Sequence, residues 1–261
     1  MSDIHAKKSL GQNFLINDGI IAKIVTAAEL TPEDTVLEVG PGTGNLTRAL
    51  AMSGARIIAV EKDHRVIEDL NAEFSAAQIE IVEGDILTFK PEDHGLIEGE
   101  YKIVANLPYY ITSHFIRTVF EEWPQPSDMI IMVQKEVAKR IMSVPPDMNL
   151  LALSVQYYAQ PEIITHVSRG SFRPIPDVDS SVIRLTPKTE YVLSAEKEQL
   201  FFSLIKAAFS GKRKQLLNTL PQVTGLNKGA LIIALENADI NPQARPETLE
   251  IADWVRLLDT V

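Results

Sequence analysis

The residues of this chain best suited to chemistry are Asn106, Pro108 and Tyr109, in the stretch Asn106-Leu107-Pro108-Tyr109. An asparagine side chain carries both a carbonyl acceptor and an amide donor. Proline offers a carbonyl oxygen without a competing backbone N–H, and tyrosine presents a flat ring on which a base can stack. Such a set can hold a planar ring that bears an exocyclic amine. The alternative is an ordinary Asn-x-Pro turn at a strand end.

The element that must position these residues is the apolar run Tyr101–Ala105, which predicts a buried strand with the motif at its carboxyl end. In open α/β sheets, ligands bind at that end of the strands. Three earlier strands are predicted to end in polar or glycine-rich residues: Thr35–Val39 before Gly40-Pro-Gly-Thr-Gly44, Arg56–Val60 before Glu61, and Ile79–Val82 before Glu83-Gly84-Asp85. We therefore expect one site at this edge of a sheet.

The glycine-rich turn contains Gly40, Gly42 and Gly44 and leads into a helix predicted through Leu46 to Met52. Glycines let the backbone approach a ligand closely, and the N-terminus of a helix follows directly. Glu61 stands about 20 residues further on, where an acidic side chain binds ribose hydroxyls in nucleotide-type sites. This order of elements indicates a cofactor with a nucleoside part.

Dinucleotides and S-adenosylmethionine both bind at such turns. The spacing Glu38-x-Gly40-x-Gly42-x-Gly44 differs from the G-x-G-x-x-G pattern of a pyrophosphate site. S-adenosylmethionine carries a cationic sulfonium and an α-amino group, so an acidic surround favours it. Asp85 is placed to accept a hydrogen bond from the adenine amine of that cofactor, and the alternative is a helix N-cap before Ile86.

The chain alternates predicted strands and helices with short links up to Pro187, which predicts a mostly parallel α/β sheet covered on both faces. We expect this domain to occupy residues 1–187, with Leu150–Ala159 as one of its helices. Beyond it the pattern is helical without strands, at residues 195–209, 212–220, 227–237 and 246–259. A small all-helical domain is therefore predicted over residues 188–261.

Composition excludes several classes of function. The 261 residues carry a formal net charge of −10 and include no cysteine, which rules out disulfides, thiolate zinc sites and cysteine nucleophiles. The five histidines lack ligand spacing, so we expect no metal. The N-terminus has no signal-peptide core and no apolar run approaches a membrane span, so we expect a cytoplasmic protein.

The acidic balance argues against nonspecific coating of nucleic acid, because phosphate binding needs clustered basic residues. Two local basic clusters are nevertheless present, one of Lys7 and Lys8 and the other of Lys212, Arg213 and Lys214. We interpret them as candidate RNA contacts. The alternative for each is a solvated face.

Eight stretches together resemble the ribosomal RNA adenine N6,N6-dimethyltransferase family of the KsgA type, and they follow the family's order over residues 7–218. They are Lys8-Ser-Leu-Gly-Gln-Asn-Phe-Leu15, Leu37-Glu-Val-Gly-Pro-Gly-Thr-Gly44, Val60-Glu-Lys-Asp63, Gly84-Asp85, Ala105-Asn-Leu-Pro-Tyr109, Val133-Gln-Lys-Glu-Val137, Ser171-Phe-x-Pro-x-Pro-x-Val-Asp179 and Phe209-x-x-x-Arg213-Lys214.

The resemblance implies a Rossmann-like methyltransferase domain, a helical C-terminal domain for RNA recognition, and S-adenosylmethionine as cofactor. The residues at the family's cofactor-binding positions are Asn13, Leu15, Gly40, Glu61, Asp85 and Asn106. By the same resemblance, Asn106 to Tyr109 hold the target adenine. The implied reaction places four methyl groups on two neighbouring adenosines in a hairpin loop near the 3′ end of small-subunit rRNA. The acidic balance departs from this usually basic family, so we expect recognition to depend on the preassembled 30S particle. We also expect a monomer.

The motif suggests how such a reaction would be favoured. The exocyclic nitrogen of adenine is a poor nucleophile because its lone pair is delocalised into the ring. Two acceptors aimed at its hydrogens, the Asn106 side-chain oxygen and the Pro108 carbonyl, would favour a pyramidal nitrogen with its lone pair freed toward the methyl group. Tyr109 would stack on the base.

Three alternatives stay open at this stage. A sister class methylates large-subunit rRNA, and its version of the motif is usually Asn-Ile-Pro-Tyr. Leu107 and the loop Ser171–Asp179 therefore favour the small-subunit type. A non-catalytic relative that binds nucleic acid is disfavoured by the intact motifs. A small-molecule methyltransferase is mildly disfavoured by the basic cluster and the helical tail.

Overall fold

The computed structural model describes residues 12–75, 78–191, 193–211 and 214–261. Its contacts divide the chain into two compact units. The first contains the residues up to Ala138 together with Gln160–Pro187, and the second contains Lys139–Ala159 and Lys188–Val261. The chain therefore enters the second unit, returns to the first, and leaves it again.

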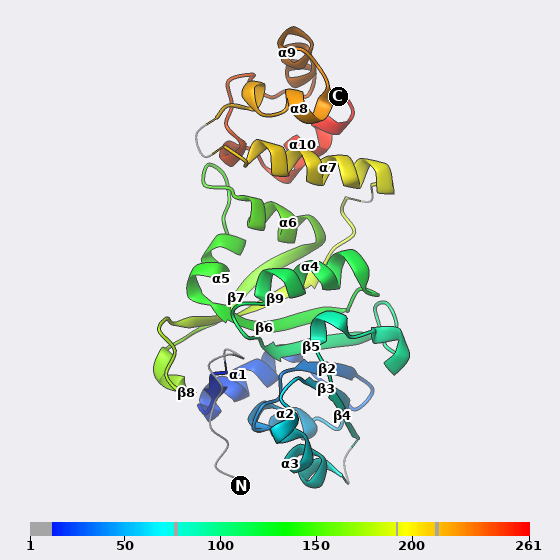
Figure 1. Cartoon of the computed structure of the whole chain (residues 1–261), viewed down its shortest axis with the longest axis vertical. Coiled ribbons are helices and arrows are strands. Elements are labelled where there is room, and N and C mark those ends of the chain that lie inside the picture. Colours follow the sequence, from blue (N-terminus) through cyan, green and yellow to red (C-terminus); the bar gives the residue numbers. More distant parts are fainter. Residues whose placement is uncertain (1–11, 76–77, 192, 212–213) are drawn as a thin grey trace. The chain divides into compact units, whose positions relative to one another are not determined.

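The first unit is built on a seven-stranded sheet in the order β4-β3-β2-β5-β6-β9-β7 (Figure 1). Its strands are β2 (Thr35–Val39), β3 (Arg56–Glu61), β4 (Ile79–Glu83), β5 (Tyr101–Asn106), β6 (Asp128–Gln134), β7 (Ala159–Val167) and β9 (Ser180–Pro187). Strands β2 to β6 pair in parallel, and β9 runs antiparallel to β6. The predicted mostly parallel, Rossmann-like sheet is confirmed.

Helices cover this sheet because its strands are apolar on both faces. Those of the first unit are α1 (Asp18–Ala28), α2 (Asn45–Ala51), α3 (His64–Phe74) and α4 (Thr112–Glu122), followed by α5 (Lys135–Ile141), which ends in the second unit. Helices α1 and α2 pack on one face, where Ile24 and Leu50 meet the strand residue Ile57. Ile103 and Ile131 point to the opposite face, which is also buried.

The N-terminal segment is anchored beside the sheet. Asn17 caps α1 by accepting a hydrogen bond from the Ile20 backbone N–H at 3.2 Å, as a capping asparagine is expected to do. Just before it, the short strand β1 (Phe14–Leu15) pairs antiparallel with β8 (Phe172–Arg173). This pairing ties the start of the described chain to the loop that precedes β9, and it was not predicted from the sequence.

The second unit is helical. It contains α6 (Leu150–Tyr158), α7 (Ala195–Ala208), α8 (Pro221–Thr224), α9 (Lys228–Asn237) and α10 (Ile251–Leu258). Helix α10 packs against α6, α7 and α9, and its Trp254 is fully buried. Among the described residues, no helix in either unit is long and apolar enough to cross a bilayer.

Two predictions need correction here. The division of the chain at Pro187 coincides with a boundary of the structure, but Lys139–Ala159 belongs to the second unit rather than to the predicted domain 1–187. The reason is an aromatic cluster, in which Tyr157 stacks on Phe201 with ring centroids 4.8 Å apart and Tyr158 donates a hydrogen bond to Glu198 at 2.6 Å. In place of a helix over 212–220, the described residues form a 3₁₀ turn at Leu216–Asn218.

Candidate active site

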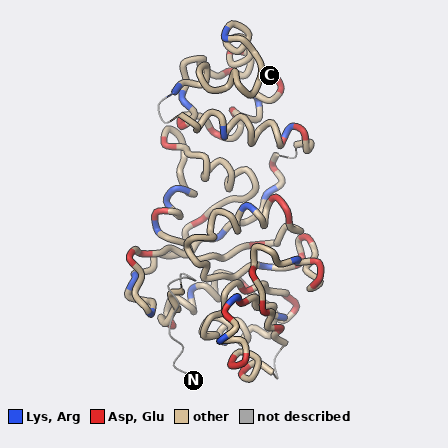
Figure 2. Tube along the Cα trace, in the orientation of Figure 1, with Lys and Arg blue, Asp and Glu red and all other residues tan. Residues whose placement is uncertain are grey.

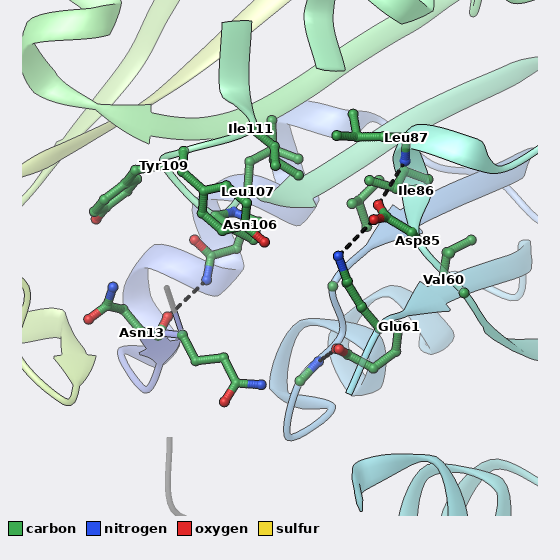
Figure 3. A pocket seen from close by; sticks show the side chains of 18 of the residues that line it. Asn13, Val60, Glu61, Asp85, Ile86, Leu87, Asn106, Leu107, Tyr109 and Ile111 are labelled. Carbon is green, nitrogen blue, oxygen red and sulfur yellow. Dashed lines mark hydrogen bonds and ion pairs between the residues drawn. The ribbon is translucent and has the colours of Figure 1, made fainter. Parts of the chain in front are cut away.

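A pocket opens in the first unit at the carboxyl ends of the parallel strands, where the sequence predicts a site (Figure 3). Its walls come from the segment before α1, the turn after β2, the ends of β3 and β4, and the motif after β5. The lining residues are Gln12, Asn13, Phe14, Val39, Gly40, Gly42, Val60, Glu61, Lys62, Gly84, Asp85, Ile86, Leu87, Asn106, Leu107, Pro108, Tyr109, Tyr110 and Ile111.

The glycine-rich turn after β2 is shaped by Gly42. Its φ of +55° lies in the left-handed region, and a Cβ on it would come within 2.9 Å of the Phe14 ring. Its backbone N–H donates to the Glu61 carboxylate at 3.0 Å. The position therefore leaves no room for a side chain, and the turn presents bare backbone to the pocket.

Glu61, at the end of β3, is buried but well supported. Its carboxylate also accepts from the backbone N–H of Asp63 at 2.8 Å. Burial raises the pKa of Glu61, and the N–H groups of Asp63 and Gly42 oppose that shift. A carboxylate offers about four acceptor positions, so two backbone bonds fix its orientation and leave capacity for ligand hydroxyls.

Asp85, after β4, has two partners in the structure. It accepts from Lys62 Nζ at 2.7 Å and from the Leu87 backbone N–H at 3.1 Å, and both contacts are drawn in Figure 3. The Lys62 ammonium, aided by the Leu87 N–H, lowers the pKa of Asp85 despite partial burial. The capping role considered from the sequence is thus present, since Asp85 caps the 3₁₀ turn Ile86–Thr88, and the side chain also lines the pocket.

Asn106 is the last residue of β5, and one contact fixes its side chain. Its Nδ2 donates to the Asn13 carbonyl at 3.2 Å, which assigns the amide nitrogen to that side. The side-chain oxygen then points toward the side on which Tyr109 lies (Figure 3). The Pro108 carbonyl accepts from the Ile111 backbone N–H at 3.2 Å and keeps a second lone pair. Both acceptors expected from the motif therefore lie at the pocket.

Tyr109 is half-buried, and its hydroxyl shares a hydrogen bond of 2.8 Å with Ser180, the first residue of β9. Burial raises the pKa of the Tyr109 phenol, and the bond to Ser180 opposes that shift. Leu107, between the two polar residues, is only 2% exposed and points into the protein. In this motif, Leu107 is therefore buried in the protein, whereas the side chains of Asn106 and Tyr109 lie at the pocket.

The structure brings together most of the predicted site residues. Asn13, Gly40, Gly42, Glu61, Asp85, Asn106, Pro108 and Tyr109 all line one pocket. Leu15 does not line it, and instead its carbonyl accepts from the Asn45 side chain at 2.8 Å beside β1.

The predicted RNA contacts are only partly visible. Lys214 is exposed, whereas Lys7, Lys8, Lys212 and Arg213 lie outside the described residues. Within the described ranges, no group of three or more potential ligands is arranged to hold a metal ion. In the backbone trace of Figure 2, Asp and Glu positions are frequent on α3, and α5 carries Glu136 together with Lys139 and Arg140.

Several lining residues were missed from the sequence. Lys62 follows Glu61 directly, Ile86 and Leu87 follow Asp85, and Tyr110 and Ile111 follow the motif. Their adjacency to predicted residues was the available signal. Phe14 carried no such signal, because its place beside Gly42 depends on how the N-terminal segment folds back.

A parallel sheet with a glycine-rich turn, an acidic residue after the second strand of that sheet and a polar motif after its fourth defines the class of Rossmann-like methyltransferases. Within that class, the chain belongs to the ribosomal RNA adenine dimethylase family, whose model matches residues 4–261. The resemblance inferred from the motifs is therefore confirmed.

Relatives and solved structures agree with this placement. The chain is 42% identical over 255 residues to a ribosomal RNA small subunit methyltransferase A of Dehalococcoides mccartyi, covering 97% of this chain and 88% of the relative. The Clostridioides difficile protein of the same name is 40% identical, with coverage of 95% and 88%.

Among solved structures, a dimethyladenosine transferase from Plasmodium falciparum superposes with a TM-score of 0.80 at 28% identity, covering 94% of this chain and 95% of that one. The 23S rRNA methyltransferase ErmE superposes with a TM-score of 0.76, also at 28% identity, covering 95% and 99%.

Proposed function

We propose that this protein transfers methyl groups from S-adenosylmethionine to N6 of two adjacent adenosines in the 3′-terminal hairpin loop of small-subunit rRNA. The observation that carries the proposal is the orientation of Asn106, whose amide nitrogen is occupied by the Asn13 carbonyl so that its oxygen is available to an exocyclic amine. The family and the relatives named small subunit methyltransferase A support the substrate class.

The pocket fits S-adenosylmethionine by its chemistry. The bare backbone at Gly42 and the oriented Glu61 carboxylate suit a ribose and a methionine chain held close to the sheet. In this proposal, Asp85, which lines the same pocket, accepts a hydrogen bond from the adenine amine of the cofactor. When bound, S-adenosylmethionine supplies an activated methyl group on a positively charged sulfur.

The protein's own contribution to the reaction is positioning. The Asn106 oxygen and the Pro108 carbonyl accept from the two N6 hydrogens of unmodified adenine, one of them accepts from the single hydrogen that remains before the second transfer, and Tyr109 stacks on the base. N6 would gain the methyl group through its lone pair and would release one proton to solvent for each methyl group added. These contacts favour the pyramidal nitrogen of the transition state over the planar ground state, which is how positioning lowers a barrier.

Two observations favour the small subunit over the large one. Relatives named ribosomal RNA small subunit methyltransferase A share 40–42% identity with this chain over 95–97% of its length. The motif of this chain reads Asn-Leu-Pro-Tyr, with Leu107 buried beneath it. We accordingly regard large-subunit methylation as disfavoured.

We further propose that the enzyme is a cytoplasmic monomer that acts on the RNA within the preassembled 30S particle. The formal charge of −10 supports this, because an acidic protein gains little from the backbone of free RNA. The helical unit and the cluster of Lys212, Arg213 and Lys214 supply recognition in this proposal.

The experiment compares methyl transfer from labelled S-adenosylmethionine to unmethylated 30S particles, to naked small-subunit rRNA and to 50S particles. We expect label in the first, much less in the second and none in the third. Equal or greater labelling of 50S particles would contradict the assignment of the substrate, and equal labelling of naked RNA would contradict the requirement for a particle.

A further inference from the structure

Glu38 is a buried carboxyl group that the proposed reaction does not use. It lies in β2, is 1% exposed, and neither of its side-chain oxygens has a hydrogen-bond partner of normal geometry. The Thr47 hydroxyl on α2 is also buried and lies near Glu38 without reaching the geometry of a hydrogen bond. Because an isolated ionised carboxylate is very costly to bury, such a group holds a proton unless a positive charge comes near.

The strand register places Glu38 directly beneath the pocket. Side chains at alternate positions of neighbouring strands share a face, and two residues beyond Glu38 this face carries Glu61 on β3 and Asn106 on β5. Between them stands Gly40, and a Cβ at that position would meet no atom within 4 Å. The space beside Gly40, which lines the pocket, is therefore open.

The surroundings of Glu38 disfavour its ionised form. Burial raises its pKa to about 8, the Glu61 carboxylate from β3 adds to the shift, and the Thr47 hydroxyl from α2 opposes it. On the β5 side the paired residue is the apolar Val104. None of the described lysines and arginines donates a hydrogen bond to Glu38 or forms an ion pair with it.

We propose that Glu38 is a proton-holding countercharge for the cofactor, neutral in the empty protein and ionised when the cationic S-adenosylmethionine occupies the pocket above it. This inference rests on the proposed cofactor. It assigns Glu38 to positioning rather than catalysis, because its side chain lies below the pocket and acts on the ligand through space.

Because the charge of Glu38 is linked to the charge of the ligand, the cofactor and its product should bind differently. S-adenosylmethionine carries a sulfonium charge that S-adenosylhomocysteine lacks, so only the former stabilises an ionised Glu38 strongly. Binding of S-adenosylmethionine should release a proton, and its affinity should rise as the pH increases toward that at which Glu38 is ionised in the empty protein. The product has no such advantage, and its release is correspondingly easier.

The experiment measures protons released on binding, by calorimetry of the full chain at pH 7 in buffers of different ionisation enthalpy. We expect wild type to release about one proton with S-adenosylmethionine and about none with S-adenosylhomocysteine. In Glu38→Gln the release with S-adenosylmethionine should be lost, and its affinity should fall about 10-fold more than that of S-adenosylhomocysteine. The control is Glu33→Gln, which changes an exposed carboxylate and should match wild type.

A second measurement uses wild type alone and so does not depend on whether the variant folds. Between pH 6 and 8, in the same experiment, the dissociation constant of S-adenosylmethionine should decrease by more than about 10-fold while that of S-adenosylhomocysteine changes little. Equal proton release for the two ligands, or equal release in wild type and Glu38→Gln, would overturn the inference. Failure of both ligands to bind would instead overturn the assignment of the cofactor.

Discussion

At the scale of single residues, the site depends on side chains whose orientation is fixed from outside the pocket. Asn106 is held by the Asn13 carbonyl, Tyr109 by Ser180, and Glu61 by two backbone N–H groups. Each supporting contact uses one hydrogen-bonding position and leaves another directed to the pocket. Such support keeps the site organised before its ligands bind, and this preorganisation accounts for much of the rate enhancement in reactions that depend on positioning.

Replacing Asn106 by Ala tests the acceptor directly. Removal of one oriented hydrogen-bond partner of a transition state costs about 100-fold to 1,000-fold in turnover, and we expect a loss of that size in methyl transfer to 30S particles. The fold should be retained, because Asn106 is only partly buried. As a control, Asn227→Ala removes an asparagine that caps α9 far along the chain and should keep normal turnover. Near-normal turnover of Asn106→Ala would refute the acceptor role.

Glu38 makes the stability of the ligand-free protein depend on pH. Its pKa is about 8 in the folded protein against 4.5 as the ordinary value, so the folded state binds more protons than the unfolded state between these values. Its contribution to the free energy of unfolding is therefore greatest below pH 4.5 and is lost as the pH rises to about 8.

Relative to Glu38→Gln, wild type should lose on the order of 3 kcal/mol between pH 5 and pH 8.5, since one unit of pKa difference corresponds to about 1.4 kcal/mol. Urea denaturation of both proteins at several pH values measures this difference. Parallel pH profiles for the two proteins would show that Glu38 is not held neutral by the fold.

At the scale of elements, the sequence predicts the parallel strands well because each is a short apolar run that ends in glycine or a polar residue. The strands β2, β3, β4 and β5 lie where they were expected, within one residue at their ends. Strands β1 and β8 were not predicted, because two residues show no periodicity and their pairing is decided by distant segments. Most residues of the pocket could be predicted because they directly follow these apolar strands, whereas Phe14 in β1 could not.

The membership of α6 in the second unit shows a different limit. The helix itself was predicted, but an apolar helical period does not reveal which core the helix joins. Tyr157 and Tyr158 find Phe201 and Glu198, which lie on α7, and this choice depends on tertiary packing alone. The helix predicted over 212–220 failed because Pro221 starts a new short helix and the preceding residues form only a turn.

The glycine-rich turn is an element whose shape can be tested. In Gly42→Ala, the added Cβ would meet the Phe14 ring at 2.9 Å, and alanine disfavours the φ of +55°. We expect a loss of about 1–3 kcal/mol in stability and at least 10-fold weaker binding of S-adenosylmethionine, measured by thermal unfolding and calorimetry.

The matched control is Gly170→Ala, where a Cβ would come no nearer than 3.7 Å to another atom and no unusual backbone angle is needed. It should leave both measurements within about 0.5 kcal/mol of wild type. If Gly42→Ala binds the cofactor as tightly as this control does, the inference that the turn lies close to the ligand is wrong.

At the scale of the whole molecule, an acidic chain must recognise an acidic polymer. The formal charge is −10, and Asp and Glu positions are spread along the chain and are frequent on α3 (Figure 2). Binding to RNA must then rely on local basic residues. The exposed Lys214, with its neighbours Lys212 and Arg213, is the cluster that the sequence singles out in the helical unit.

Simultaneous replacement of Lys212, Arg213 and Lys214 by Ala should weaken binding to small-subunit rRNA and flatten its dependence on salt. Each lost phosphate contact lowers the slope of log affinity against log salt by about 0.7–0.9. Binding titrations at several salt concentrations give this slope, with Lys228→Ala as a control on the same unit. An unchanged slope in the triple variant would mean that the cluster is only a solvated face.

The most direct test of the central claim is mass mapping of rRNA that this protein has methylated. Unmethylated 30S particles are incubated with the enzyme and S-adenosylmethionine, and nuclease fragments of the RNA are weighed and sequenced. We predict two adjacent N6,N6-dimethyladenosines in the 3′-terminal hairpin loop, and none when Asn106→Ala replaces wild type. Methyl groups on other bases, on isolated adenosines or only in large-subunit rRNA would contradict the account.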